Sequence, residues 1–227
     1  MPRSLDIDWQ GERLTLLPSR AIGWSAQRAL VVADLHLGKP ASFRALGVPA
    51  PEAVTAADLA RLTHALQETN ASRLIILGDL IHAASGRTDA AMTAVAQWRR
   101  EHESLDILVV RGNHDRRAGD PPADWRCRCV DGPFPLGALD LVHEPESAAD
   151  RPALAGHIHP AVAAAAPFGP ARLRAPCFWF GPALAVLPAF GGFTGCRAVR
   201  PAAGDRVFAV GEDSVDDLAS RASAQRR

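Results

Sequence analysis

Five short apolar runs alternate with longer polar stretches along the first 155 residues. They cover residues 29–33, 73–77, 106–110, 138–142 and 153–155. Each run is too short for a buried helix, and an unbroken apolar run is typical of a strand buried on both faces. We therefore predict five buried strands at these positions.

Two segments between the first three runs have the apolar spacing of amphipathic helices. Segment 51–69 opens with a proline and carries leucines at helical intervals, and segment 88–102 carries Met92, Val95 and Trp98. Both predict helices that bury one face. A strand–helix–strand order in turn predicts parallel strands joined by right-handed crossovers.

The pattern changes after about residue 120. Short apolar segments, such as 125–130 and 176–180, are joined by Pro and Gly turns with little room for helices. This second half predicts a largely antiparallel sheet. No Ser/Gly-rich or charged linker divides the halves, so we expect residues 1–211 to form a single domain. Residues 212–227 are polar and aperiodic, and we expect a disordered tail there.

Composition and charge narrow the classes of protein that fit. The 25 basic and 25 acidic residues of the 227-residue chain balance to a formal net charge of zero. This balance argues against a strongly basic nucleic-acid binder and against a disordered polyelectrolyte. No apolar run reaches the roughly 18 residues of a membrane span, and the start lacks the apolar core of a secretory signal. With four cysteines and no CxxC spacing, we expect reduced thiols in a cytoplasmic protein without membrane contact.

Polar residues of the kinds that bind metal ions follow every one of the five predicted strands. They are Asp34, His36, Asp79, Asn113, His143, His157 and His159. Ligand sites in open α/β sheets form at the carboxyl ends of the strands, so we expect these side chains to lie together. Carboxylate, imidazole and amide ligands suit Mn, Fe or Zn better than Mg or Ca.

Residue spacing supports a shared site. In extended backbone, residues two apart point to the same side, so Asp34 and His36 could bind one ion. The same argument lets His157 and His159 face one cavity. Glycines at positions 78, 112 and 156 would let the backbone approach a ligand closely.

Each short motif is weak alone, because a single DxH or GD pair occurs often by chance. All five motifs in one order, each at a strand end, make chance a poor explanation. Two other histidines, His64 and His102, lie on helical patterns and are expected at the surface. His82, three residues after Asp79, is equally consistent with an outer-shell position and with a plain loop.

The motifs DxH, GD, GNHD, H and GHxH, in this order, resemble the signature blocks of the calcineurin-like metallophosphoesterases. The resemblance implies an α/β fold: a four-layer sandwich of two mixed β-sheets flanked by helices. It implies hydrolysis of phosphoester bonds through a hydroxide activated by two divalent ions, for which we expect Mn, with Fe or Zn as alternatives. The implied roles are Asp34, His36 and His159 for one ion; Asn113, His143 and His157 for the other; Asp79 as the bridge; and His114 as the catalytic residue.

A closer resemblance covers residues 14–210. The segments ADLHLGKPASFRALGVPAPE, RGNHDRRAGDPP, GHIHPAV and PCFWFGPALAVLPAFGGFTG are similar to the bacterial DNA-ligase-associated metallophosphoesterases. This resemblance implies a Mn-dependent phosphodiesterase, a DNA endonuclease of DNA repair that works with a DNA ligase, a helicase and an exonuclease. The protein Ser/Thr phosphatases of the superfamily carry GDxVDRG and GNHE, whereas this chain has GDLIHAAS and GNHD.

The residues themselves give less support for a DNA substrate. Arg111, Arg116 and Arg117 flank the loop of His114, and Lys39 follows the first motif, so these cations could hold phosphate groups. The aromatic run 178–180 could stack on bases, although its alternation fits a core strand better.

Two alternatives to a DNA endonuclease stay open. One is the same chemistry on a small soluble phosphodiester such as a cyclic nucleotide. The other is a catalytically silent scaffold, which the full set of metal-binding residues argues against. Asp115, next to His114, could orient that histidine or only shape the turn.

Overall fold

The computed structural model describes residues 3–148, 150–165 and 172–219. The strands are β1 (Leu5–Trp9), β2 (Glu12–Leu17), β3 (Ala21–Trp24), β4 (Ala29–Val32), β5 (Arg73–Leu77), β6 (Asp106–Val110), β7 (Cys127–Val130), β8 (Phe134–Leu136), β9 (Leu139–Leu141), β10 (Ala153–Ala155), β11 (Pro160–Ala165), β12 (Arg172–Phe180), β13 (Leu184–Val186), β14 (Arg197–Ala198), β15 (Arg206–Val210) and β16 (Val215–Asp217). The α-helices are α1 (Lys39–Ala45), α2 (Val54–Thr69), α3 (Asp89–Glu101) and α4 (Asn113–Ala118), and the 3-10 helices are η1 (Ser25–Gln27), η2 (Ala84–Gly86), η3 (Ala123–Trp125) and η4 (Pro145–Ser147).

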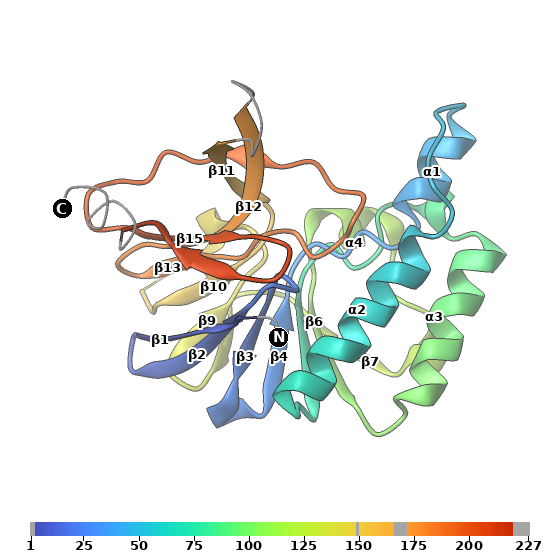
Figure 1. Cartoon of the computed structure of the whole chain (residues 1–227). Coiled ribbons are helices and arrows are strands. Elements are labelled where there is room, and N and C mark those ends of the chain that lie inside the picture. The colour runs from blue at the N-terminus through green and yellow to red at the C-terminus, as the bar shows by residue number, and fades with distance from the viewer. Residues whose placement is uncertain (1–2, 149, 166–171, 220–227) are drawn as a thin grey trace.

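The first sheet follows the chain order from β1 to β7. Strands β1 to β4 pair antiparallel, and β4 to β7 pair parallel. Helices α2 and α3 connect the parallel strands and lie on the same outer face of this sheet (Figure 1). The predicted strands at 29–33, 73–77 and 106–110 and both predicted helices are confirmed. The antiparallel strands β1 to β3 and the short helix α1 were not predicted.

The second sheet is mixed, with the path β14-β11-β12-β13-β10-β9-β8, and β15 pairs with β12. Its strand β10 pairs parallel with both β9 and β13, while β12 pairs antiparallel with β11, β13 and β15. One assignment was wrong: segment 125–130 contains β7, which pairs parallel with β6 in the first sheet. Sequence alternation cannot distinguish the edge of one sheet from the start of the next.

The core explains why the strand patterns are unbroken apolar runs. Alternate residues of β5 point to opposite faces: Leu74 and Ile76 pack toward the helices, and Ile75 and Leu77 pack between the sheets. The cluster between the sheets also includes Leu154, Phe178 and Phe208 from the second sheet. Both faces of the central strands therefore exclude water, which accounts for the missing polar positions.

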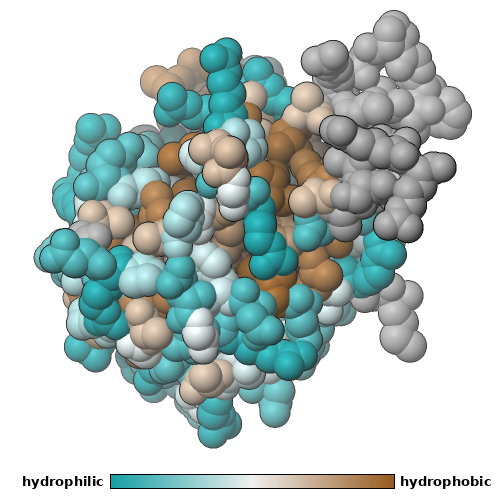
Figure 2. Space-filling view, turned by 90° about the vertical axis from the view of Figure 1, so that its left-hand side faces the viewer, coloured by the Kyte–Doolittle hydropathy of each residue, from teal (hydrophilic) through white to brown (hydrophobic). Residues whose placement is uncertain are grey.

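The outer face of the second sheet differs from the predicted helical layer. Among the described residues, no α-helix lies on this face; a small apolar cluster does, including Val142, Ala153 and Val186, with Ala148 from the loop after η4 packed against it. Figure 2 views the molecule from the left-hand side of Figure 1 and shows hydrophobic residues gathered in one part of that surface. The α/β class, the two mixed sheets and the flanking helices on the first sheet are as expected, whereas the fourth layer is not seen in these ranges.

The C-terminal prediction needs correction at its start. Residues 212–217 are not a tail, because β16 pairs with β15, and Val215 is only 3% exposed in the cluster between the sheets. One buried residue among polar neighbours leaves no periodicity, so the sequence pattern missed this strand. Residues 220–227 lie outside the described part, and the extent of the domain stays a prediction.

Two further expectations concern the thiols and the membrane. The four cysteines are free, and burial raises the pKa of the Cys127 and Cys177 thiols to about 12. Within the described ranges, no helix is long and apolar enough to cross a bilayer.

Candidate active site

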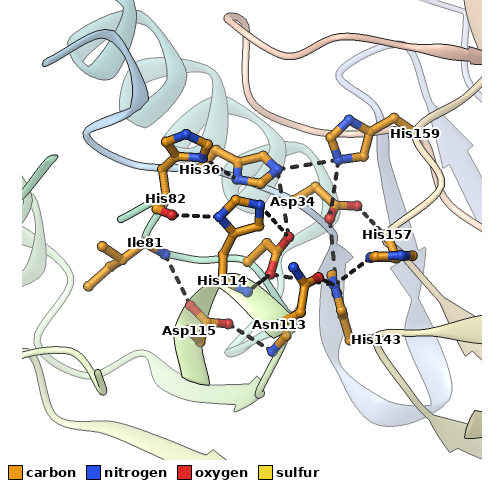
Figure 3. A network of polar contacts seen from close by, with 12 residues as sticks. Asp34, His36, Ile81, His82, Asn113, His114, Asp115, His143, His157 and His159 are labelled. Atoms are coloured by element: carbon orange, nitrogen blue, oxygen red, sulfur yellow. Dashed lines mark hydrogen bonds and ion pairs between the residues drawn. The ribbon is translucent and has the colours of Figure 1, made fainter. Parts of the chain in front are cut away.

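The carboxyl ends of β4, β5, β6, β9 and β10 meet at one edge of the two sheets, and the predicted metal-binding residues lie there (Figure 3). Three groups of side chains have ligand atoms within 4.8 Å of one another: Asp34, His36 and His159; Asp79, His143 and His157; and His36, His82 and His114. The first two groups consist entirely of predicted metal ligands. The carboxamide oxygen of Asn113 lies 3.1 Å from Nε2 of His143, beside the second group. The first two groups and Asn113, together named here the ligand cluster, are therefore adjacent.

The backbone presents these side chains differently from the extended geometry that the spacing suggested. Asp34, His36, His157 and His159 have φ values of 55°, 49°, 71° and 51°, in the left-handed region. Such residues cost about 1–3 kcal/mol each and persist only where surrounding structure fixes them. His157 and His159 also fall into different groups rather than one. The residues converge as expected, but the cause is not that residues two apart in an extended strand point to the same side.

Glycines let the strand ends approach one another. A Cβ on Gly78, whose φ is +74°, would lie 2.2 Å from Nδ1 of His143, and a Cβ on Gly112 would lie 2.2 Å from Oδ1 of Asp79. Gly156 is similarly close to Asp34, with 2.9 Å between such a Cβ and Oδ2. The backbone itself therefore forms part of the wall around both carboxylates.

An unpartnered oxygen in the first group tests whether the cluster fits a metal ion. Asp34 is fully buried, and its Oδ2 accepts a hydrogen bond from the His157 amide at 2.9 Å. Its Oδ1 has no hydrogen-bond partner, and Nε2 of His159 lies 3.4 Å away. A buried carboxylate oxygen without a partner is costly unless a cation balances it. The donor set therefore fits a divalent ion at this position.

Asp79 lies between the two groups, with one oxygen toward each. Its Oδ1 is 3.4 Å from Nε2 of His143, and its Oδ2 is 3.8 Å from Nε2 of His36. Burial raises the pKa of this carboxyl, and the nearby Asp34 carboxylate raises it further. Divalent cations on both sides would favour the ionised form and reverse that tendency.

Backbone carbonyls fix the orientation of two histidines. Nδ1 of His143 donates to the carbonyl of Leu77 at 2.9 Å, and Nδ1 of His159 donates to the carbonyl of Gly195 at 3.0 Å. In the neutral imidazole this leaves the Nε2 lone pair directed into the cluster, the arrangement typical of metal-binding histidines.

His82 belongs to this site, although the sequence left its position open. Its Nδ1 lies 3.2 Å from Nδ1 of His36, and its ring stacks on that of His114 with centroids 4.7 Å apart. Its carbonyl accepts a hydrogen bond from Nδ1 of His114 at 2.6 Å. Burial, followed by the charge of His114, lowers the pKa of His82 to about 4. The only sequence signal was its place three residues after Asp79.

Asp115 shapes the loops around His114. Its two oxygens accept hydrogen bonds from the Gly112 amide at 2.9 Å and the Ile81 amide at 3.1 Å (Figure 3). The side chain is buried, so it ties the first turn of α4 to the loop that carries His82. His114 therefore projects from a turn that is fixed on both sides.

The basic residues predicted to bind substrate phosphates lie around the cluster, and they differ in how far they are exposed or already paired. Lys39 begins α1 and is half-buried; burial lowers its pKa, while Asp34 and Asp79 act in the opposite direction. Arg116 and Arg117 are exposed on α4, and Arg116 lies 3.4 Å from Glu144. Arg111 is different, because Asp120 binds its guanidinium through two contacts of 2.7 and 2.8 Å and Asp131 through a third. Each of its three guanidinium nitrogens therefore already has a carboxylate partner within the protein.

Five aromatic or histidine residues that the sequence singled out lie away from the site. Phe178 and Phe180 are buried between the sheets, so the core interpretation of this strand is the correct one. Trp179 faces the other side and donates to Asp205 at 2.7 Å. His64 is exposed on α2, and His102 stacks on Trp98 at the end of α3.

The family assignment agrees with this geometry. Residues 27–164 match the family model described as calcineurin-like phosphoesterase. The chain belongs to this family and is a hydrolase acting on phosphoester bonds.

Solved structures give a more specific likeness. The chain is similar to the Pseudomonas putida nuclease MPE, with 42% identity, a TM-score of 0.83, and coverage of 95% of this chain and 100% of that one. The phosphoesterase Yfce from E. coli is 18% identical with a TM-score of 0.39, covering 82% of this chain and 95% of that one. A comparison with curated protein sequences gave no match.

Proposed function

We propose that this protein is a Mn-dependent phosphodiesterase that cuts DNA internally and acts in DNA repair in the cytoplasm. The 42% identity with a nuclease over 95% of the chain supports a nucleic-acid substrate. The observation that carries the chemistry is the position of Asp79, with one carboxylate oxygen toward each group of histidines. The sequence resemblance extends the proposal to a DNA ligase, a helicase and an exonuclease as working partners.

Each member of the ligand cluster has a proposed role. Asp34, His36 and His159 would hold one ion, Asn113, His143 and His157 the other, and Asp79 would bind both. Two divalent ions supply Lewis acidity and lower the pKa of a bound water, the chemistry that phosphodiester hydrolysis needs. Two carboxylates against two dications leave a net positive site, which attracts a phosphodiester anion.

His114 is proposed to donate the proton that the leaving oxygen takes up. Its Nδ1 is held by the carbonyl of His82 at 2.6 Å, so the ring cannot turn freely. Its Nε2 then faces the cluster, 4.0 Å from Oδ2 of Asp79. A proton on Nε2 would therefore be directed at a phosphodiester bound beside Asp79. The stacked ring of His82 supports this orientation.

The proposal is tested by hydrolysis assays on metal-stripped protein reloaded with Mn. End-labelled single- and double-stranded DNA, a closed circular DNA, a cyclic nucleotide and a chromogenic phosphodiester are assayed in parallel. We expect internal cuts, seen as conversion of the circle to linear or nicked forms. Cleavage of only the small diesters would keep the chemistry and contradict the DNA substrate. No turnover of any diester by the reloaded protein would contradict the whole proposal.

A further inference from the structure

A hollow of about 260 Å³ opens beside the ligand cluster. It is lined by Lys39 and Phe43 of α1 and by a glycine-rich loop, namely Gly192, Phe193, Thr194 and Gly195. The two phenylalanine rings meet edge to face, with centroids 5.5 Å apart. Both rings are half-buried, so each keeps surface available to a ligand.

Both walls of the hollow are attached to the site. On one wall, the Lys39 amide donates to the carbonyl of His36 at 3.0 Å, and the Phe43 ring lies 6.3 Å from that of His82. On the other wall, the carbonyl of Gly195 accepts the hydrogen bond of His159. A ligand in the hollow would therefore be adjacent to the reacting phosphodiester.

The loop that carries Phe193 is fixed rather than free. The Gly191 amide donates to the carbonyl of Asp34 at 3.1 Å, and the Gly192 amide donates to the buried carboxylate of Asp58 at 3.0 Å. The Thr194 hydroxyl closes the turn onto the carbonyl of Gly191 at 2.9 Å. The aromatic surface is therefore held in place before a ligand arrives, which lowers the entropic cost of binding.

The chemistry of the hollow selects a flat aromatic group next to an anion. Aromatic side chains provide stacking surfaces for nucleobases regardless of sequence. The Lys39 ammonium, on the side of the cluster, supplies charge for a phosphate. The volume is below the range of about 300–1,000 Å³ for pockets that enclose a drug-sized ligand, and so it suits a single ring. A base paired inside a duplex cannot expose its faces to these side chains.

We propose that Phe43 and Phe193 form a subsite for one unpaired nucleobase next to the scissile phosphodiester, with Lys39 binding the adjoining phosphate. This inference rests on the proposed nuclease function and specifies how the strand is held. It makes the two phenylalanines specificity-determining residues, because they contact the base and not the reacting atoms.

The test separates base recognition from phosphate recognition. The His114→Ala protein, loaded with Mn, binds fluorescent oligothymidylate or an abasic oligomer of equal length, and anisotropy gives the two dissociation constants. We expect oligothymidylate to bind about tenfold more tightly, the effect of one stacked base. Adding Phe193→Ala or Phe43→Ala should remove this difference while leaving abasic binding unchanged. Lys39→Met should weaken binding of both oligomers.

Two further variants control for lost packing and for non-specific effects of a substitution. Phe193→Leu keeps apolar bulk for packing but has no ring face, so it should behave like the alanine variant. Leu46→Ala, at an exposed position 80% accessible and outside the hollow, should change neither constant. Equal binding of both oligomers before any phenylalanine is replaced, or an equal loss for both in the phenylalanine variants, would overturn the subsite. If Mn-loaded protein hydrolyses small diesters but neither binds nor cuts any oligomer, the proposed nuclease function fails with it.

Discussion

The ligand cluster and its rim are built in opposite ways. The cluster contains buried carboxylates and left-handed backbone, and the glycines next to it have no space for a side chain. The rim, which we define as Lys39, Phe43, Arg116, Arg117 and Phe193, consists of exposed or half-buried side chains on two short helices and a loop. Several neighbouring groups fix the position of each side chain in the cluster. The side chains of the rim are held by fewer contacts.

This difference predicts different consequences of substitution. A change in the cluster disturbs several neighbours together, because one carboxylate serves several partners; Asp79 alone approaches His36, His114 and His143. A change at the rim removes one interaction with a substrate. Cluster variants should therefore lose turnover and metal, and rim variants should chiefly alter binding of the substrate.

The largest effect is expected for Asp79→Asn. The amide keeps the size of the carboxylate but removes the charge placed between the two groups. Replacing a partner outside the ligand shell typically costs about 10–100-fold in metal affinity or activity, and a shared ligand should cost more. We expect loss of turnover together with loss of Mn, measured on the same sample by elemental analysis. Two retained Mn ions per chain would contradict the bridging role.

His114→Ala should come next and should separate proton transfer from metal binding. We expect kcat to fall by about 10²–10⁴-fold, the contribution of a general acid, while Mn content stays at the wild-type level. His64→Ala provides a matched control, because it removes an exposed histidine from α2. Unchanged turnover in His114→Ala would rule out the proposed role, as would an equal loss in the control.

The smallest effects belong to Arg116→Ala and Arg117→Ala at the rim. Each exposed guanidinium should make one phosphate contact with a single strand. Each replacement should therefore make the slope of log binding constant against log salt concentration shallower by about 0.7. The chromogenic diester, which has no further phosphates, should be turned over normally. Arg100→Ala, at an exposed position of α3, is the control. A collapse of kcat on the small diester would place these arginines in the cluster instead.

The sequence predicts the cluster well because its residues follow strand ends. The apolar runs locate β4, β5 and β6, and parallel pairing then brings Asp34, Asp79 and Asn113 to one edge. The five motifs reflect a local geometry that few residue types satisfy. The sequence could not reveal the left-handed backbone at Asp34 and His36, because a positive φ is uncommon even for Asp and His, although these types adopt it more often than most other non-glycine residues.

Other residues around the cluster and the outer strands were harder to predict for physical reasons. His82 gains its place from stacking on His114, a contact between loops that no local pattern records. The sequence allowed Arg111 to be a phosphate ligand, and only the fold shows that it is paired with Asp120. Strand β16 depends on one buried residue, Val215, which leaves no periodicity.

The central claim is that the ligand cluster binds two divalent ions joined by Asp79. Calorimetric titration of metal-stripped protein with Mn tests it most directly, because the stoichiometry does not depend on the substrate. We predict two Mn ions per chain for the wild type. A plateau at one ion, or no binding, would contradict the account of the site.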